Sequence, residues 1–122
     1  KDILSYSLRF KKILFIYNQM TYTKYWIPFP FIDIYFIVWK PNALSKIHNH
    51  SKHGCWMFII KGIVKEEIYT KELNLINTNY HGTFETSYLN DDIGYHRIKN
   101  SNQYSYSLHF YHPRNHKTIY FN

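Results

Sequence analysis

The chain has 122 residues, which is the usual length of one domain. Hydrophobic residues make up 45% of it and aromatic residues 20%, so the chain can bury a core, which excludes a disordered protein and a collagen-like repeat. The net charge of +7 would favour polyanions, but the basic residues are scattered and form no long run, so we expect no specific nucleic-acid partner.

Residues 1–29 carry apolar side chains at mixed spacings, which we interpret as a short helical or irregular N-terminal segment. From residue 30 the pattern changes to short β-branched and aromatic runs that end at turn signals such as Pro41-Asn42. The predicted strands are residues 31–39, 56–60, 63–70, 87–90, 95–98, 105–111 and 118–121, and the polar residues 71–86 are predicted to be irregular. This pattern favours one mainly β domain over residues 1–122, with a small barrel or sandwich over residues 30–122.

Three features of the sequence bear on where the protein works. No apolar run approaches the length of a membrane span, and the N-terminal residues lack the pattern of a signal peptide. The single cysteine, Cys55, excludes an intrachain disulfide and suits a reducing compartment. We therefore expect a monomeric cytoplasmic protein with no membrane partner.

His48-Asn49-His50 is the sharpest motif in the chain. In a strand, residues two apart point to the same face with Cα atoms about 6.6 Å apart, so two imidazoles placed in this way can bind one metal ion. A lone His-x-His pair is often an accident of a protein surface. Here, however, further residues follow it at suggestive spacings, namely Cys55, Gly62, Gly94-Tyr95-His96 and Asn100.

This spacing resembles the two motifs of the cupin superfamily, with Cys55 in the position where the first motif has Glu. Three segments are similar to the signatures of the cysteine dioxygenase family of thiol dioxygenases, over about residues 22–113: Ile47-His48-Asn49-His50 with Cys55, Tyr88-Leu-Asn-Asp-Asp-Ile-Gly-Tyr-His96-Arg-Ile-Lys-Asn100, and Ser107-Leu108-His109-Phe110-Tyr111-x-Pro113. The resemblance implies a cupin double-stranded β-helix, which is a small β-barrel. It also implies an Fe(2+) enzyme that uses O2 to oxidise L-cysteine to cysteine sulfinic acid.

The resemblance implies that His48, His50 and His96 are the iron ligands. With Cys55 in place of a ligand carboxylate, the iron would keep its full positive charge, which suits an anionic substrate that chelates through a thiolate and an amine. Cys55 itself has three interpretations: a thioether crosslink to Tyr111, a free thiol beside the iron, or an ordinary buried cysteine.

Ser107, His109 and Tyr111 alternate along a predicted strand and therefore share one face. The resemblance implies a relay in which Ser107 orients His109 and His109 orients the Tyr111 hydroxyl near the metal. The alternative is a half-buried strand whose polar groups are simply satisfied.

Tyr22-Thr23-Lys24 resembles a Tyr-Thr-Arg segment of the family, whose Arg binds the substrate carboxylate. Lys24 would offer a point charge instead of a planar fork, and the alternative is an exposed lysine. Trp39 also stands where the family has a Trp, so Tyr22, Lys24 and Trp39 are the candidate substrate-binding residues. The remaining histidines, His53, His81, His112 and His116, are predicted to be solvated in loops or the tail, and the alternative for His53 is a contact that supports the nearby metal ligands.

Three other functions compete with cysteine oxidation. The first is the same chemistry on another small thiol such as 3-mercaptopropionate, and the second is a metal-binding cupin without catalysis. The third is a basic nucleic-acid binder, which would show steeply salt-dependent retention on DNA.

Overall fold

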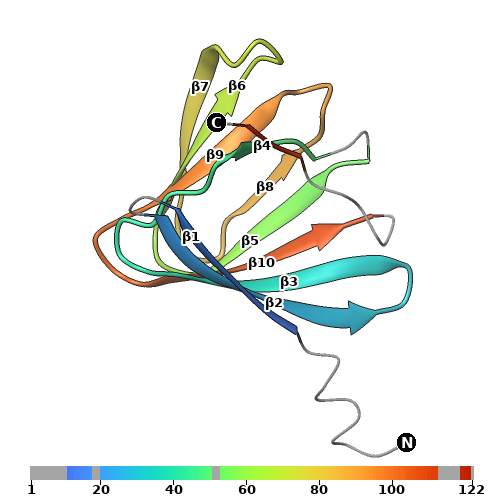
Figure 1. Ribbon diagram of the computed structural model, residues 1–122, viewed down its shortest axis with the longest axis vertical. Helices are drawn as coiled ribbons and strands as arrows, with labels where there is room; N and C mark the ends of the chain where they lie inside the picture. The colour runs from blue at the N-terminus through green and yellow to red at the C-terminus, as the bar shows by residue number, and fades with distance from the viewer. Residues whose placement is uncertain (1–10, 18–19, 51–52, 113–118, 122) are drawn as a thin grey trace, which may run out of the picture.

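The computed structural model describes residues 11–17, 20–50, 53–112 and 119–121 (Figure 1). The regular elements in these ranges are all strands, so no helix there is available to cross a membrane. In chain order they are β1 (Lys11–Tyr17), β2 (Met20–Phe29), β3 (Ile32–Trp39), β4 (Ile47–His48), β5 (Cys55–Lys61), β6 (Val64–Tyr69), β7 (Leu75–His81), β8 (Thr86–Leu89), β9 (Tyr95–Asn100), β10 (Ser105–Tyr111) and β11 (Tyr120–Phe121).

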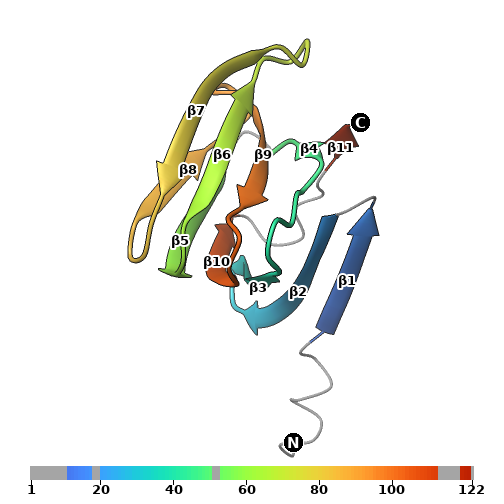
Figure 2. The same cartoon turned by 90° about the vertical axis from the view of Figure 1, so that its left-hand side faces the viewer.

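The strands form two antiparallel sheets that face each other (Figure 2). One sheet has the order β1-β2-β3-β10-β5-β8, and the other has the order β11-β4-β9-β6-β7. The core lies between the sheets and consists of Tyr22, Ile37, Trp39, Ala43, Met57, Ile59, Val64 and Ile98. The inner faces of the two sheets therefore enclose a single core, and the histidines of the sequence motifs lie in it.

Strand β10 shows how the sequence builds this arrangement. Its residues alternate strictly between buried and half-buried, with Ser105, Ser107, His109 and Tyr111 pointing inward. The outward residues of β10 are apolar or aromatic, and Tyr106 stacks on Phe36 of β3 at 6.2 Å between ring centroids. The inner face of β10 is therefore polar and the outer face apolar, and the strand is recognised by this alternation and by its aromatic content.

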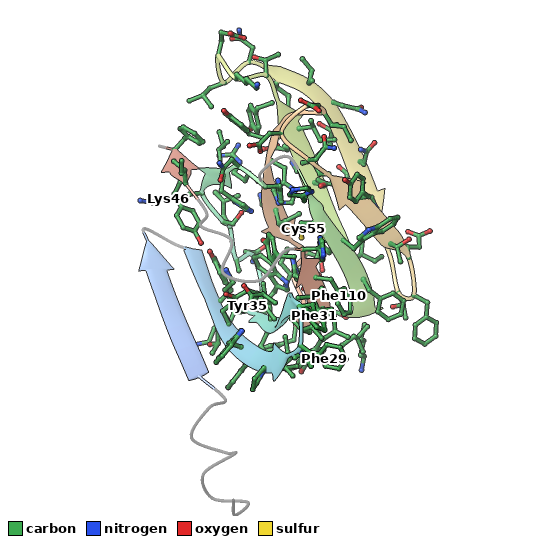
Figure 3. The ribbon with its side chains drawn as sticks, turned by 90° about the vertical axis from the view of Figure 1, so that its right-hand side faces the viewer. Phe29, Phe31, Tyr35, Lys46, Cys55 and Phe110 are labelled. Carbon is green, nitrogen blue, oxygen red and sulfur yellow. The ribbon has the colours of Figure 1, made fainter. Side chains whose placement is uncertain are left out.

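Close packing at the turn between β5 and β6 requires a glycine. Gly62 has a φ of +108°, and a Cβ atom on it would lie 2.1 Å from Oγ of Ser105. Only glycine combines this backbone conformation with that approach. The turn between β2 and β3, in contrast, exposes two aromatic side chains, Phe29 and Phe31, which are labelled in the lower part of Figure 3.

Two predictions about secondary structure were wrong. The helical or irregular segment over residues 1–29 is extended in its described part, because residues 11–17 and 20–29 form β1 and β2; residues 1–10, 18 and 19 lie outside the described ranges. The segment 71–86 contains β7, which pairs with β6 along its whole length. The side chains of β7 are mostly exposed, so the strand is held by its backbone hydrogen bonds to β6 and not by burial of an apolar face.

Candidate metal centre

Three histidines from neighbouring segments meet inside the barrel. His48 and His96 are directly paired across β4 and β9, and His50 follows two residues after His48. The backbone N–H of His50 donates to Oδ1 of Asp91 at 2.8 Å, which fixes the chain just beyond β4. The residues His48, His50 and His96 are 9%, 0% and 3% exposed, and one ring nitrogen of each lies within 4.8 Å of the others.

The hydrogen bonds at the back of these rings set which nitrogens face the centre. Nδ1 of His48 lies 2.8 Å from the carbonyl oxygen of Lys46, and Nδ1 of His96 lies 2.6 Å from Oε2 of Glu66. Both acceptors lack hydrogen, so both Nδ1 atoms carry the proton and both Nε2 atoms present a lone pair. Burial lowers the pKa of His48 well below its ordinary value, so that ring is neutral.

These nitrogens are suited to a cation. The Nε2 atom of His96 lies 2.9 Å from Nε2 of His48 and 2.9 Å from Nε2 of His50. Two unprotonated nitrogens repel each other at this distance, and a positive ion shared between them reverses that repulsion. Neutral imidazole donors fit divalent transition metals such as Fe(2+), Mn(2+) or Zn(2+).

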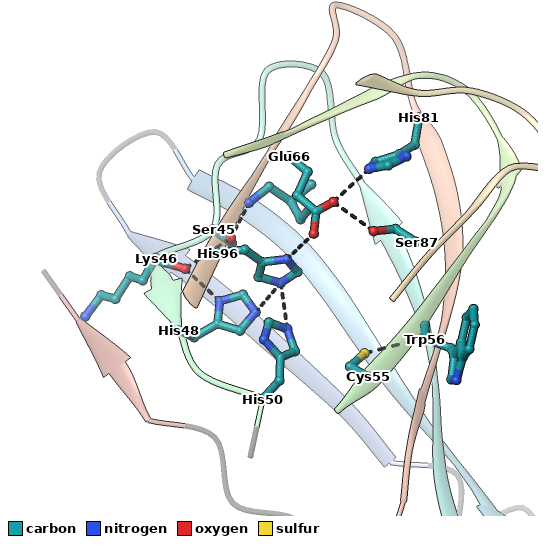
Figure 4. A network of polar contacts seen from close by, with 11 residues as sticks. Ser45, Lys46, His48, His50, Cys55, Trp56, Glu66, His81, Ser87 and His96 are labelled. Carbon is teal, nitrogen blue, oxygen red and sulfur yellow. Dashed lines mark hydrogen bonds and ion pairs between the residues drawn. The ribbon is translucent and has the colours of Figure 1, made fainter. Parts of the chain in front are cut away.

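Glu66 is a buried carboxylate behind His96 that sequence reasoning missed (Figure 4). Its Oε2 accepts from His96, and its Oε1 accepts from Nε2 of His81 at 2.7 Å and from Oγ of Ser87 at 2.8 Å. Burial opposes ionisation of Glu66, but the hydrogen bonds from His81, His96 and Ser87 outweigh it and hold its pKa well below the ordinary value. The strand pattern places Glu66 at an inward position between Val64 and Ile68, but it does not indicate the contact with His96.

His81 also corrects a prediction. We expected it to be solvated in a loop, but it ends β7 and its ring is engaged by Glu66, with a side-chain exposure of 14%. His53, in contrast, is exposed as expected.

The opposite wall of the pocket comes from the six-stranded sheet. Tyr22, Lys24, Trp39, His109 and Tyr111 line the same small cavity as His48 and His96. Lys24 is half-buried rather than exposed, and its Nζ lies 4.5 Å from the ring centroid of Tyr35. Burial lowers the pKa of Lys24 to about 8. A cation therefore lines the cavity from the sheet opposite His48 and His96.

Trp39, Ser107 and His109 are linked by hydrogen bonds. Nε1 of Trp39 donates to Oγ of Ser107 at 2.9 Å, and Oγ of Ser107 lies 2.8 Å from Nε2 of His109. Burial lowers the pKa of His109 to about 3, so its ring is neutral. Trp39 anchors Ser107 as well as lining the pocket.

Cys55 and Tyr111 are directly paired across β5 and β10, and their side chains are hydrogen-bonded. Burial raises the pKa of Cys55 to about 12, although the hydrogen bond with Tyr111 works in the other direction. Burial likewise raises the pKa of Tyr111 well above its ordinary value. Both groups are therefore neutral at physiological pH, with sulfur and phenol in contact.

Tyr120 is a pocket residue that the motifs did not indicate. It is paired with His48 across β11 and β4, and its ring centroid lies 5.6 Å from that of His48. Asn49 holds this strand in place, because its Oδ1 accepts from the backbone N–H of Ile119 at 2.8 Å and its own N–H donates to the Ile119 carbonyl at 3.1 Å. The middle residue of His-x-His thus positions the C-terminal side of the pocket.

We expect the metal-free protein to lose stability in acid, in part because of His109. Burial and the charge of Lys24 lower the pKa of His109 to about 3, whereas the unfolded chain titrates near 6.5. The unfolded state binds more protons between these values, so the stabilisation is complete above pH of about 6.5 and is lost as pH falls toward 3. Urea denaturation at a series of pH values should show this slope, up to about 1.4 kcal/mol per pH unit from this ring. An identical slope in His109→Gln would contradict the assignment.

Comparisons with known proteins agree with the motifs. The sequence model of the family described as cysteine dioxygenase type I matches residues 12–122. Cysteine dioxygenase type 1 of Rattus norvegicus and that of Mus musculus are each 28% identical to this chain over 89 residues. The matched region is 66% of this chain and 44% of those proteins, so the chain spans less than half the length of the curated relatives it matches.

Solved structures share the fold at much lower identity. A Bacillus subtilis oxalate decarboxylase with Mn(II) centers superposes with a TM-score of 0.71 at 13% identity, covering 82% of this chain and 28% of that chain. An oxalate oxidase in complex with the substrate analogue glycolate gives a TM-score of 0.63 at 14% identity, covering 73% of this chain and 45% of that one. The similarity confirms the predicted mainly β cupin fold.

Proposed function

The chain belongs to the cysteine dioxygenase type I family, and we propose that it is an Fe(2+)-dependent thiol dioxygenase whose substrate is L-cysteine. The observation that carries the proposal is the buried group of His48, His50 and His96. Two of these residues, His48 and His96, line one cavity together with Lys24 and Tyr111. In the reaction, the thiol and O2 combine so that both oxygen atoms end on sulfur as a sulfinic acid. We expect the reaction in the cytoplasm, where the single thiol stays reduced.

A bound ferrous ion would supply a place where thiolate and O2 meet, and it would favour loss of the thiol proton. His48, His50 and His96 would hold it through Nε2. The chain's other residues bind and orient the substrate. The ammonium of Lys24 attracts its carboxylate, and the hydroxyl of Tyr111 offers a hydrogen bond near the reacting sulfur.

The pairing of Cys55 with Tyr111 supports the proposal of a thioether crosslink between them. Forming the carbon–sulfur bond removes two hydrogen atoms, which O2 accepts, so it requires aerobic exposure with metal and thiol. Intact-mass measurement before and after turnover tests it: a loss of two hydrogen atoms is expected, and Cys55→Ser should show none. An unchanged mass after turnover would assign Cys55 as a free thiol.

Oxygen uptake by the purified chain, loaded with Fe(2+) under anaerobic conditions, tests the function. With L-cysteine we expect stoichiometric O2 consumption, and with ¹⁸O2 we expect both heavy atoms in cysteine sulfinic acid by mass spectrometry. Metal loading without uptake on any small thiol would instead favour a metal-binding cupin that lacks catalysis.

The chemistry of Lys24 favours one second candidate substrate. A point charge binds a carboxylate without requiring the planar geometry of a guanidinium fork, so 3-mercaptopropionate, which has a carboxylate but no amine, fits the same contact. Direct competition of the two thiols, followed by product analysis, distinguishes these substrates.

A further inference from the structure

We propose that Glu66, locked by His81 and Ser87, is a positioning residue that sets through His96 how tightly the centre holds its metal and how easily that metal is oxidised. This inference rests on the metal centre of the proposed function but is independent of which thiol is the substrate.

The first argument is the burial of Glu66. Its side chain is 1% exposed, and an ionised carboxylate is costly there unless hydrogen bonds replace water. Three donors meet that requirement, two at Oε1 and one at Oε2. The carboxylate is therefore a fixed negative charge inside the barrel rather than a surface group that happens to lie near the site.

The second argument is the origin of the three donors. His81 belongs to β7 and His96 to β9, on the same sheet as Glu66, whereas Ser87 belongs to β8 on the opposite sheet. Oε1 therefore accepts hydrogen bonds from both sheets, and Oε2 is directed at Nδ1 of His96 (Figure 4). A carboxylate held by His96 alone could rotate; one held at the other oxygen by two donors cannot rotate without breaking both bonds.

The third argument is electrostatic. Three neutral imidazoles leave the double positive charge of a divalent metal uncompensated, since within the described part of the chain no carboxylate is among the ligand atoms that converge here. Glu66 returns one negative charge at a distance of one ring, and a carboxylate on the outer N–H of a ligand imidazole makes the inner nitrogen a stronger donor. The higher oxidation state gains more from this charge than the lower one does.

The test compares Glu66→Gln with the matched control Glu67→Gln. Glu67 is the next residue on β6, but it faces outward and pairs with Arg97 and Lys65. Competition with a chromophoric chelator under anaerobic conditions measures Fe(2+) affinity, and a redox titration measures the midpoint potential of the bound iron. For Glu66→Gln we expect an affinity loss of about 10–100-fold and a raised potential; for Glu67→Gln we expect neither.

His81 provides the second pair of variants. His81→Gln keeps an N–H donor and should retain an affinity close to the original, whereas His81→Leu removes the donor and should fall between the original protein and Glu66→Gln. Circular dichroism of the metal-free proteins reports folding separately, and the His81 pair decides the question if Glu66→Gln fails to fold.

The outcomes separate this inference from the proposed function. Unchanged affinity and potential in Glu66→Gln, or equal changes in Glu67→Gln, would overturn the inference while leaving thiol oxidation intact. A protein that binds iron with the expected differences but oxidises no thiol would overturn only the proposed function. An original protein that binds no metal would overturn both.

Discussion

Replacement of His50 by alanine is expected to abolish metal binding and, with it, thiol oxidation. His50 is fully buried, its Nε2 lies 2.9 Å from that of His96, and its ring is parallel to that of Tyr111 at 6.3 Å. Removing it deletes one of three proposed ligands and opens a cavity beside Tyr111. The loss of affinity should exceed the ~10–100-fold expected for a residue that only supports a ligand. Elemental analysis of protein dialysed against limiting Fe(2+) measures the effect directly.

The matched control for His50→Ala is His53→Ala, a histidine three residues later on the chain. Its side chain is exposed and lies edge-on to His112 at 6.0 Å between ring centroids, and its backbone carbonyl accepts from the Tyr88 hydroxyl at 3.2 Å. We expect full metal content and full oxygen uptake in this variant. Retention of one iron per chain in His50→Ala, with normal activity, would mean that the three histidines do not form the centre.

The strands that the sequence predicts are those whose inner residues are apolar or belong to a known motif. Strand β2 was missed because Lys24 points inward, between Tyr22 and Trp26, and this breaks the pattern that identifies a half-buried strand. Strand β7 was missed for a different reason: it lies at the edge of its sheet with mostly exposed residues, so its backbone bonds to β6 carry the information. In β2 an inward lysine interrupts the alternation of apolar and polar residues, and in β7 the pairing with β6 determines the strand although its side chains show no such alternation.

The candidate site divides in the same way. His48, His50 and His96 were predictable because short spacings and a family signature report them. The roles of Glu66 and His81 could not be predicted, because Glu66 contacts both His96 and His81 across strands that only the folded sheet brings together. The sequence places Glu66 on the inner face of β6 but carries no indication that His96 lies within reach.

Removal of the charge of Lys24 is expected to cost more than any other change outside the metal ligands. Lys24→Met keeps the aliphatic stem beside Tyr35 but deletes the cation that faces the cavity. A charged contact to a substrate carboxylate is worth about 2–3 kcal/mol, so kcat/KM for L-cysteine should fall by ~100-fold, mostly through KM. Cysteamine, which has no carboxylate, should be oxidised equally well by both proteins. An equal loss for both thiols would assign Lys24 a structural role instead.

The pH dependence of the same contact gives an independent check, because burial lowers the pKa of Lys24 to about 8. The value of kcat/KM reports ionisations of the free enzyme and free substrate, so the original protein should lose efficiency with L-cysteine as pH rises through about 8. The thiol of L-cysteine titrates in the same range, and Lys24→Arg corrects for it, since a guanidinium stays charged throughout. The ratio of kcat/KM between the original protein and Lys24→Arg isolates the ammonium: it should be constant below pH of about 7 and decline above 8. A ratio that is flat from pH 6 to about 10 would show that no titrating lysine holds the substrate.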